Sequence, residues 1–270
     1  LLIMTDQGTM VLTGKRALDF SGCVSAEDDL ALGGYTAIMG PNGQAQVHAS
    51  DVASAYRILN QYYAATYVAP GARRPTRRDT SDAMTRDITL EAYPDNLLHG
   101  FKTVGDIFSP DSNGDRKKPF AVRPIMQAVV DRDAQPLERW AGIHGAETVV
   151  VWETHIGGYG TCVIGIENQP IARLDTPAAN GPDQLAAGTL YPQASRKLAR
   201  ALNSASGRRP VVVLANLSGF DGSPESLRNW QLEYGAEIGR AVTNFDGPII
   251  FVVLSRYHGG AYVVFSKALN

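Results

Sequence analysis

Cysteine is scarce in this sequence, and the two that occur lie far apart. Cys23 and Cys162 are the only cysteines among 270 residues, and neither belongs to a Cys-x-x-Cys or Cys/His spacing. A disulfide framework and a structural zinc site are therefore excluded by composition. We expect a reduced, cytoplasmic protein.

Long apolar runs and an excess of charge of one sign are also missing. No run is long enough to span a bilayer, and residues 1–6 lack the basic region and cleavage site of a signal peptide. The 25 basic and 27 acidic residues nearly balance, so no whole-protein field attracts nucleic acid or anionic membrane. An arginine cluster at residues 73–78 could bind phosphates, but without interleaved aromatics we interpret it as a solvated basic linker.

The usual side-chain catalysts are absent as well. The sequence has no P-loop and no Gly-x-Gly-x-x-Gly, and Ser218 does not lie in a Gly-x-Ser-x-Gly turn. The five histidines show no His-x-His or His-Glu-x-x-His spacing, and no metal site is expected. Glu153 and His155 flank an apolar strand without further ligands. Chemistry by backbone dipoles is favoured over a titrating pair of side chains.

The composition changes twice along the chain. Residues 1–68 form a first block, residues 69–100 are linker-like, and residues 101–270 form a larger block. In the first block we expect a short strand at residues 10–12, glycine turns at 32–35 and 40–43, and a helix after Asp51. Both ends of the chain look cut, which suggests a segment of a longer polypeptide.

The larger block alternates apolar runs with helical patterns, which predicts parallel α/β layers. A continuous helix over residues 224–243, capped by Ser223, shows the clearest helical period. Its predicted buried face carries Leu227, Trp230, Tyr234, Ile238 and Ala241. The predicted strands are Thr148–Trp152, Thr161–Ile166, Val211–Ala215 and Ile249–Leu254, and a further helix covers 193–205.

Two glycine-rich loops follow the last two strands, where parallel α/β folds place their ligands. They are Asn216–Ser223 and Tyr257–Ala261. Gly259 and Gly260 permit close approach of backbone amides to a ligand oxygen, as in an oxyanion hole, or they serve a tight turn. His258 either donates to that oxygen or is a turn residue. Phe220 is an apolar wall of the site or plain core.

These loops carry a family resemblance. Leu-Ala-Asn-Leu-Ser-Gly-Phe-Asp-Gly-Ser at 214–223 and Tyr-His-Gly-Gly-Ala-Tyr-Val-Val at 257–264 resemble paired motifs of the carboxyltransferase component of biotin-dependent acyl-CoA carboxylases. The acetyl-CoA carboxylase type is the most similar. Residues 25–34 and 175–192 also resemble family segments, in the family's order, so the similarity extends over nearly the whole chain.

The resemblance implies two tandem crotonase-like (ClpP/crotonase) α/β domains, each a superhelix of ββα turns. Residues 1–68 would be the rear of the N-terminal acyl-CoA domain, 69–100 a linker, and 101–270 the C-terminal biotin domain, truncated at its end. The implied activity moves a carboxyl group from carboxybiotin to the α-carbon of an acyl-CoA, within an ATP-dependent complex of fatty acid metabolism. Implied partners are biotin carboxylase, the biotin carboxyl carrier, and further copies of this chain, with active sites between subunits.

The resemblance also assigns residues. The amides of Gly260 and Ala261 would hold the ureido oxygen of biotin. The biotin pocket would be lined by His258, Gly259, Gly219, Phe220 and Val263. Candidates on the acyl-CoA side are Gly33, Gly34 and Tyr35.

Three departures from the family pattern weaken the inference that this chain has the family's full activity. The glycine-rich oxyanion hole for the thioester lies upstream in the family and is missing here. Ser218 and His258 stand where the acetyl-CoA branch often has arginine. Alternative functions are therefore another crotonase-type acyl-CoA enzyme, such as a decarboxylase or hydratase, and a non-catalytic segment of a carboxylase complex.

Overall fold

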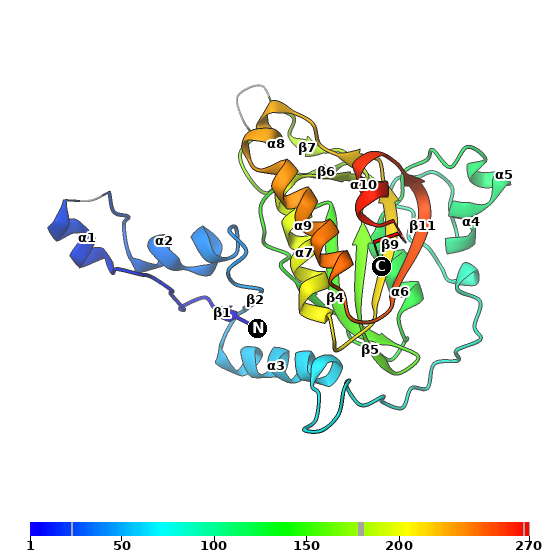
Figure 1. The fold of residues 1–270 in the computed structure, drawn as a ribbon, viewed down its shortest axis with the longest axis horizontal. Coiled ribbons are helices and arrows are strands. Elements are labelled where there is room, and N and C mark those ends of the chain that lie inside the picture. The colour runs from blue at the N-terminus through cyan, green and yellow to red at the C-terminus, as the bar shows by residue number, and fades with distance from the viewer. Residues whose placement is uncertain (23, 178–180, 267, 270) are drawn as a thin grey trace.

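The computed structural model describes residues 1–22, 24–177, 181–266 and 268–269, so Cys23 and part of the 175–192 segment lie outside it. A five-stranded sheet forms its centre, in the order β11-β9-β5-β4-β3 (Figure 1). The bounds of these strands are β3 Leu137–Arg139, β4 Val149–Ile156, β5 Tyr159–Ile166, β9 Val211–Leu217 and β11 Ile249–Tyr257.

The strand directions are mixed. β5, β9 and β11 run parallel, whereas β4 pairs antiparallel with both β5 and β3. β4 and β5 form a hairpin that turns at Gly157 and Gly158, which have φ of +58° and +80°. All four predicted apolar strands are confirmed, and the parallel arrangement holds for three of the five strands.

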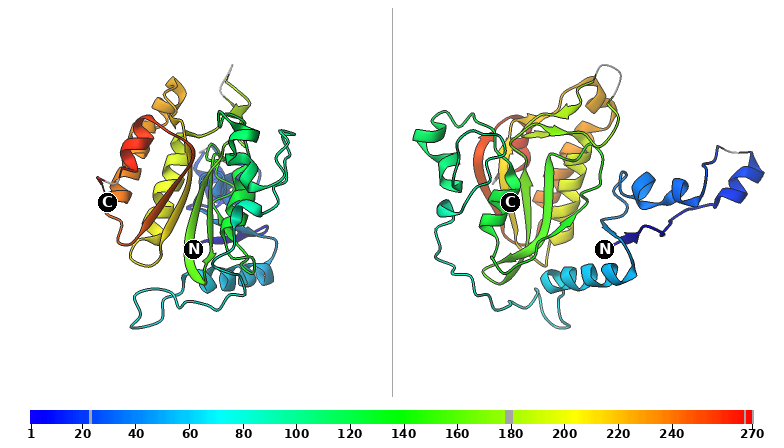
Figure 2. Two further views of the ribbon diagram at one scale, coloured as in Figure 1. Left: turned by 90° about the vertical axis from the view of Figure 1, so that its right-hand side faces the viewer. Right: turned by 180° about the vertical axis from the view of Figure 1, so that it is seen from behind.

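Helices cover both faces of the sheet (Figure 2). Alternate residues of β9 point to opposite sides, so Val211 and Val213 pack into one buried cluster and Val212 and Leu214 into another. The first cluster lies under α7, α9 and α10, and the second under α4 and α6. The bounds of these helices are α4 Val104–Phe108, α6 Val122–Val129, α7 Pro192–Ala205, α9 Gln231–Thr243 and α10 Gly259–Val264.

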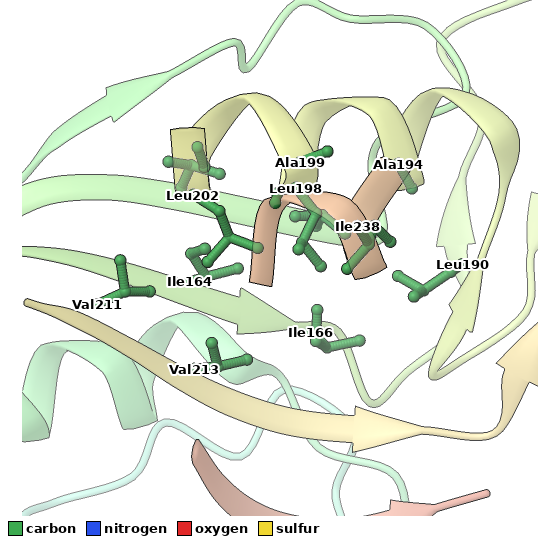
Figure 3. Close-up of a cluster of buried hydrophobic side chains, with 14 of the residues drawn as sticks. Ile164, Ile166, Leu190, Ala194, Leu198, Ala199, Leu202, Val211, Val213 and Ile238 are labelled. Carbon is green, nitrogen blue, oxygen red and sulfur yellow. The ribbon is translucent and has the colours of Figure 1, made fainter. Parts of the chain in front are cut away.

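The first cluster shows why α7 forms where the sequence predicts it. Pro192 occupies the first turn, where its missing N–H costs nothing. Leu198 and Leu202 are fully buried against Ile164 of β5 (Figure 3). Burial of each such leucine contributes about 1.5–3 kcal/mol relative to its exposed state.

Two polar side chains of α7, Ser195 and Lys197, are also buried. Lys197 is 2% exposed, and its Nζ has the carbonyl of Ala146 at 3.5 Å. Burial lowers the pKa of Lys197 to about 8, although Glu138 opposes this shift. At neutral pH the ammonium is therefore charged in both the folded and the unfolded state, and the cost of burying it is fully present.

Lys197→Met should raise the free energy of unfolding at pH 7 by about 1–3 kcal/mol, because it removes a buried charge and keeps the volume. In the parent protein, stability from this group should rise from pH 8 toward pH 10, because the unfolded lysine, with its usual pKa of 10.5, then binds more protons. Denaturant unfolding at pH 7, 8, 9 and 10 measures both effects. A less stable variant at pH 7, or an unchanged pH profile, would contradict this account.

The long helix predicted over 224–243 is wrong, because the chain forms two helices. α8 spans Pro224–Arg228 and α9 begins at Gln231. Trp230 between them has φ +69°, a left-handed conformation that no continuous α-helix contains. Leu227 and Trp230 are therefore not on a buried face but are 48% and 67% exposed. The predicted cap holds, since Ser223 Oγ accepts from the amide of Ser226 at 3.2 Å.

Residues 1–68 form an arm whose first part extends away from the sheet (Figure 1). The helix at its end, Val52–Thr66, packs against β4 and β5. The strand predicted at residues 10–12 is wrong; Thr9 makes only a single bridge with Gly34. The predicted helix after Asp51 is confirmed, with Asp51 capping Ser54 at 2.6 Å. The elements of the arm are β1 Ile3–Thr5, α1 Lys15–Ser21, α2 Asp29–Gly33, the π-helix η1 Tyr35–Met39, β2 Val47–Ala49 and α3 Val52–Thr66.

Residues 69–100 pack against the larger block. Asp133 accepts hydrogen bonds from Arg78, Thr80 and Ser81, and the Arg77 guanidinium lies 4.9 Å from the Tyr159 ring centre. For Arg77 and Arg78, the interpretation as a solvated linker is wrong. The remaining short elements are η2 Ile88–Leu90, α5 Pro110–Asn113, β6 Ile171–Ala172, β7 Gln184–Leu185, β8 Thr189–Leu190 and β10 Gly219–Phe220.

A buried ionic triad lies between the strands of the sheet. Glu153 Oε1 of β4 accepts from Arg139 Nη1 at 2.7 Å and from Arg209 Nη2 at 3.1 Å. The three side chains are between 0% and 3% exposed. One carboxylate is therefore shared by two buried guanidinium groups, which leaves the triad a net charge of +1 and makes these residues depend on one another strongly.

Candidate functional site

The two glycine-rich loops predicted to share a site do lie together. β11 and β9 run in parallel register, from Ile249 opposite Val211 to Tyr257 opposite Leu217, so both strands leave the sheet at the same edge. The amide of His258 donates to the carbonyl of Leu217 at 3.1 Å. This edge is the carboxyl end of parallel strands, as the sequence predicts.

The glycines are required where the second loop becomes a helix. Gly259 is the first residue of α10 and has φ +61°, which L-residues rarely adopt. A Cβ added at Gly260 would lie 2.8 Å from Phe220 Cδ2, well inside van der Waals contact. A Cβ added at Gly259 would lie 4.0 Å from the Cα of Gly219. α10 therefore touches the first loop through its glycine backbone.

The two loops contact each other at Phe220. Its ring also contacts α9, because a Cβ added at Gly235 would lie 3.2 Å from Phe220 Cζ. Phe220 pairs with Leu190 of β8 in a short parallel ladder. The carbonyl of Leu190 accepts a hydrogen bond from the amide of Asp221 at 3.0 Å. Phe220 is only half-buried, so it serves both as packing and as an apolar wall.

The first turn of α10 presents free backbone amides. The amide of Tyr262 donates to the carbonyl of His258 at 3.3 Å, but within the described residues the amides of Gly260 and Ala261 have no acceptor. Such unpaired N–H groups favour an electron-rich oxygen. Ala261 is fully buried, whereas Val263 is 60% exposed. His258 precedes the helix as an exposed residue, and its side chain makes no capping hydrogen bond.

A buried polar network that sequence reasoning missed lies beneath the loops. Asn216, at the end of β9, has no exposed surface; its Oδ1 accepts from Arg256 Nε at 3.1 Å and its Nδ2 donates to Asn168 Oδ1. Arg256 Nη2 also donates to the carbonyl of Ala187 at 3.2 Å. The network joins the carboxyl ends of β5, β9 and β11. Its only sequence signal is a polar residue that ends an apolar run.

The neighbouring side chains are held in structural roles. Ser218 Oγ donates to the carbonyl of Ala187 at 3.3 Å and hydrogen-bonds Thr189 Oγ1 at 3.1 Å, so it is no free nucleophile. Glu167 Oε1 accepts from the amides of Val122 at 3.0 Å and Asn168 at 2.9 Å, and burial raises the pKa of its carboxyl. Neither residue offers a catalytic group to the loops.

The three acyl-CoA-side candidates lie elsewhere in this chain. Gly33, Gly34 and Tyr35 belong to the arm, at the end of α2 and the start of η1, and α2 lies apart from α10 (Figure 1). The glycine turn predicted at 32–35 is wrong, because Gly33 ends α2 and Tyr35 begins η1. Gly33 is needed for packing, since a Cβ there would lie 2.3 Å from the carbonyl oxygen of Met10. The Tyr35 ring packs against His48, with ring centres 4.6 Å apart.

The described residues hold no group of three or more His, Cys, Asp or Glu side chains arranged to bind a metal ion. None of their helices combines the length and apolar character needed to cross a bilayer.

Comparison with known families and sequences gives consistent matches. The family model described as "Carboxyl transferase domain" matches residues 1–270. Acetyl-CoA carboxylase of Schizosaccharomyces pombe is 31% identical over 135 residues, which cover 46% of this chain and 6% of that protein. The mitochondrial acetyl-CoA carboxylase of Saccharomyces cerevisiae (strain ATCC 204508 / S288c) is 25% identical over 285 residues, covering 99% and 12%. The chain thus spans a small part of these relatives.

Among solved structures, the chain is similar to transcarboxylase 12S, a hexameric multienzyme core crystallised with hydrolysed methylmalonyl-coenzyme A bound. The TM-score is 0.75 at 20% sequence identity, over 100% of this chain and 45% of that one. A second structure of this protein, with methylmalonyl-coenzyme A and methylmalonic acid bound, gives a TM-score of 0.74. The likeness confirms the crotonase-like α/β fold that the sequence predicts.

Proposed function

The chain belongs to the carboxyl transferase domain family, and from that premise we propose that it moves a carboxyl group from carboxybiotin to the α-carbon of an acyl-CoA. The observation that carries the proposal is the meeting of its two glycine loops. Gly260 lies against Phe220, and the amides of Gly260 and Ala261 have no acceptor within the described residues. The relatives are acetyl-CoA carboxylases, and transcarboxylase 12S binds methylmalonyl-coenzyme A.

The residues at this edge fit a bound biotin ring. Gly219, Gly259 and Gly260 bring the two loops together without side chains between their backbones, and Phe220 and the exposed Val263 are the apolar residues beside them. The amides of Gly260 and Ala261 would donate to the ureido oxygen, where negative charge develops, and His258 borders the same turn. Biotin, when bound, supplies the carboxyl group. The chain's own contribution is to hold that oxygen with preoriented dipoles that need no proton transfer.

The acyl-CoA side of the site belongs to a different surface. Gly33, Gly34 and Tyr35 lie in the arm, where α2 ends and η1 begins, and α2 is away from α10 of the same chain (Figure 1). We infer that the arm of one subunit faces α10 of another, so that the active enzyme is at least a dimer. The proposal includes a biotin carboxyl carrier and a biotin carboxylase as partners, and a cytoplasmic location.

The test is a reverse-transfer assay with the natural polypeptide that contains this chain. Labelled carboxyl from malonyl-CoA or methylmalonyl-CoA should move to free biotin. An oligomeric, folded protein that transfers none with either thioester would overturn the proposal. Loss of the carboxyl without biotin would favour a crotonase-type decarboxylase instead, and capture of a biotin carrier without turnover would favour a non-catalytic role.

A further inference from the structure

A cationic cavity lies at the edge of the sheet opposite the glycine loops. Its volume is about 290 Å³, and its charged lining is Arg73, Arg74, Arg208, Arg209 and Asp246. These residues come from the segment after α3 and from the loops just before β9 and β11, whereas the glycine loops follow those strands. The seven residues of β9 separate the two places by about 20 Å, at roughly 3.3 Å per residue.

The positive charge in this cavity is not balanced by the protein. Within the described part of the chain, the exposed guanidinium groups of Arg73, Arg74 and Arg208 form no ion pair, although the whole protein has a net charge of −2. Arg209 is buried and shares Glu153 with Arg139, and its Nε has no hydrogen-bond partner. Among the residues that the structure describes, Asp246 is the one carboxylate in the lining.

An aromatic wall adjoins the arginines. A second cavity of about 890 Å³ shares Arg73, Arg208 and Asp246 with the first and is also lined by tyrosines from the end of α3. The rings of Tyr63 and Tyr67 lie 6.1 Å apart, and these residues are 50% and 56% exposed. Exposed tyrosine faces beside unpaired arginines offer stacking and phosphate binding within one groove.

We propose that this groove binds a soluble ligand with the chemistry of a nucleotide. Its phosphates lie against Arg73, Arg74 and Arg208, because planar guanidinium groups pair bidentately with phosphate oxygens. Its planar ring stacks on Tyr63 or Tyr67. Asp246 disfavours additional anionic groups at its side of the groove. The site is independent of the carboxyl-transfer proposal, since it uses neither glycine loop.

Isothermal titration calorimetry with ADP, pyrophosphate and adenosine tests the groove. ADP should bind more tightly than either pyrophosphate or adenosine. The double variant Arg73→Gln/Arg74→Gln should weaken ADP binding about tenfold or more, because it removes two unpaired cations. Tyr67→Leu should weaken ADP binding about fivefold and leave pyrophosphate binding unchanged, because only the nucleotide has a ring to stack.

A matched control removes two positive charges elsewhere. Arg16→Gln/Arg116→Gln changes two exposed arginines outside the groove and should leave ADP binding within about twofold of the parent, since it removes long-range charge only. The proposal is overturned if ADP does not bind at millimolar concentration, if the control weakens it as much as the groove variant, or if pyrophosphate binds as tightly. Preference for a single-stranded oligonucleotide over ADP would also overturn it. Unchanged circular dichroism shows that each variant is folded.

Discussion

Gly260→Val should reduce carboxyl transfer to biotin by about a hundredfold to a thousandfold, the loss expected when one donor of an oxyanion hole is displaced. The added Cβ would lie 2.8 Å from Phe220 Cδ2, so the ring or the start of α10 must move. Either movement shifts the amides of residues 260 and 261 away from the oxygen they are proposed to hold. The measurement is the rate of labelled carboxyl transfer from malonyl-CoA or methylmalonyl-CoA to free biotin.

Gly222→Val is the matched control for this experiment. Gly222 lies in the partner loop, but an added Cβ meets no atom within 4 Å. The control should therefore retain activity within about threefold of the parent, since exposed substitutions away from close contacts have small effects. If Gly260→Val keeps full transfer activity, the assignment of the biotin-side amides is wrong, whatever the function of the protein. Thermal unfolding of both variants separates lost function from lost folding.

Glu153→Gln should destabilise the protein by about 3–5 kcal/mol, the usual effect of breaking a buried ion pair. The carboxylate accepts from Arg139 at 2.7 Å and Arg209 at 3.1 Å, and none of the three side chains is more than 3% exposed. Glutamine keeps the size of glutamate but leaves two buried guanidinium groups without a counter-charge. Denaturant unfolding at neutral pH measures the loss.

A surface pair provides the comparison. Glu233 pairs with Arg240 at 2.6 Å, but both side chains are 55% exposed. Glu233→Gln should therefore cost less than about 1 kcal/mol, because water solvates both partners. Equal losses in the two variants would show that burial does not decide the strength of the triad. Exchanging Glu153 and Arg139 together for leucine and methionine should recover part of the stability, since only one charge then stays unpaired.

The sequence was sufficient where local pattern determines structure. The apolar runs at 211–215 and 249–254 became neighbouring parallel strands, and both loops after them met at the same edge. Ser223 at the start of α8 was placed correctly because a side-chain cap acts within a few residues. The loop glycines were recognisable for the same reason.

The predictions were wrong or incomplete where contacts between residues far apart in the sequence determine the structure. Helical period continues through residues 224–243, but at Trp230 the chain takes a left-handed turn with the side chain in solvent, which periodicity cannot reveal. The Asn216 network joins residues 40 and 48 positions away, so no local pattern identifies it. In the arm, the predicted helix after Asp51 formed, but its apolar residues Val52 and Tyr56 are each 65% exposed.

Phe220 has a consequence for the dimensions of the candidate pocket. Its ring fills the gap between a glycine of α9 and a glycine of α10, so it acts as a spacer between the two helices. The position of the α10 amides is thereby set by the size of one side chain that reacts with nothing. A smaller residue at position 220 would let α10 move toward α9. The dimensions of the pocket would then change, although the backbone groups that hold the ligand would stay the same.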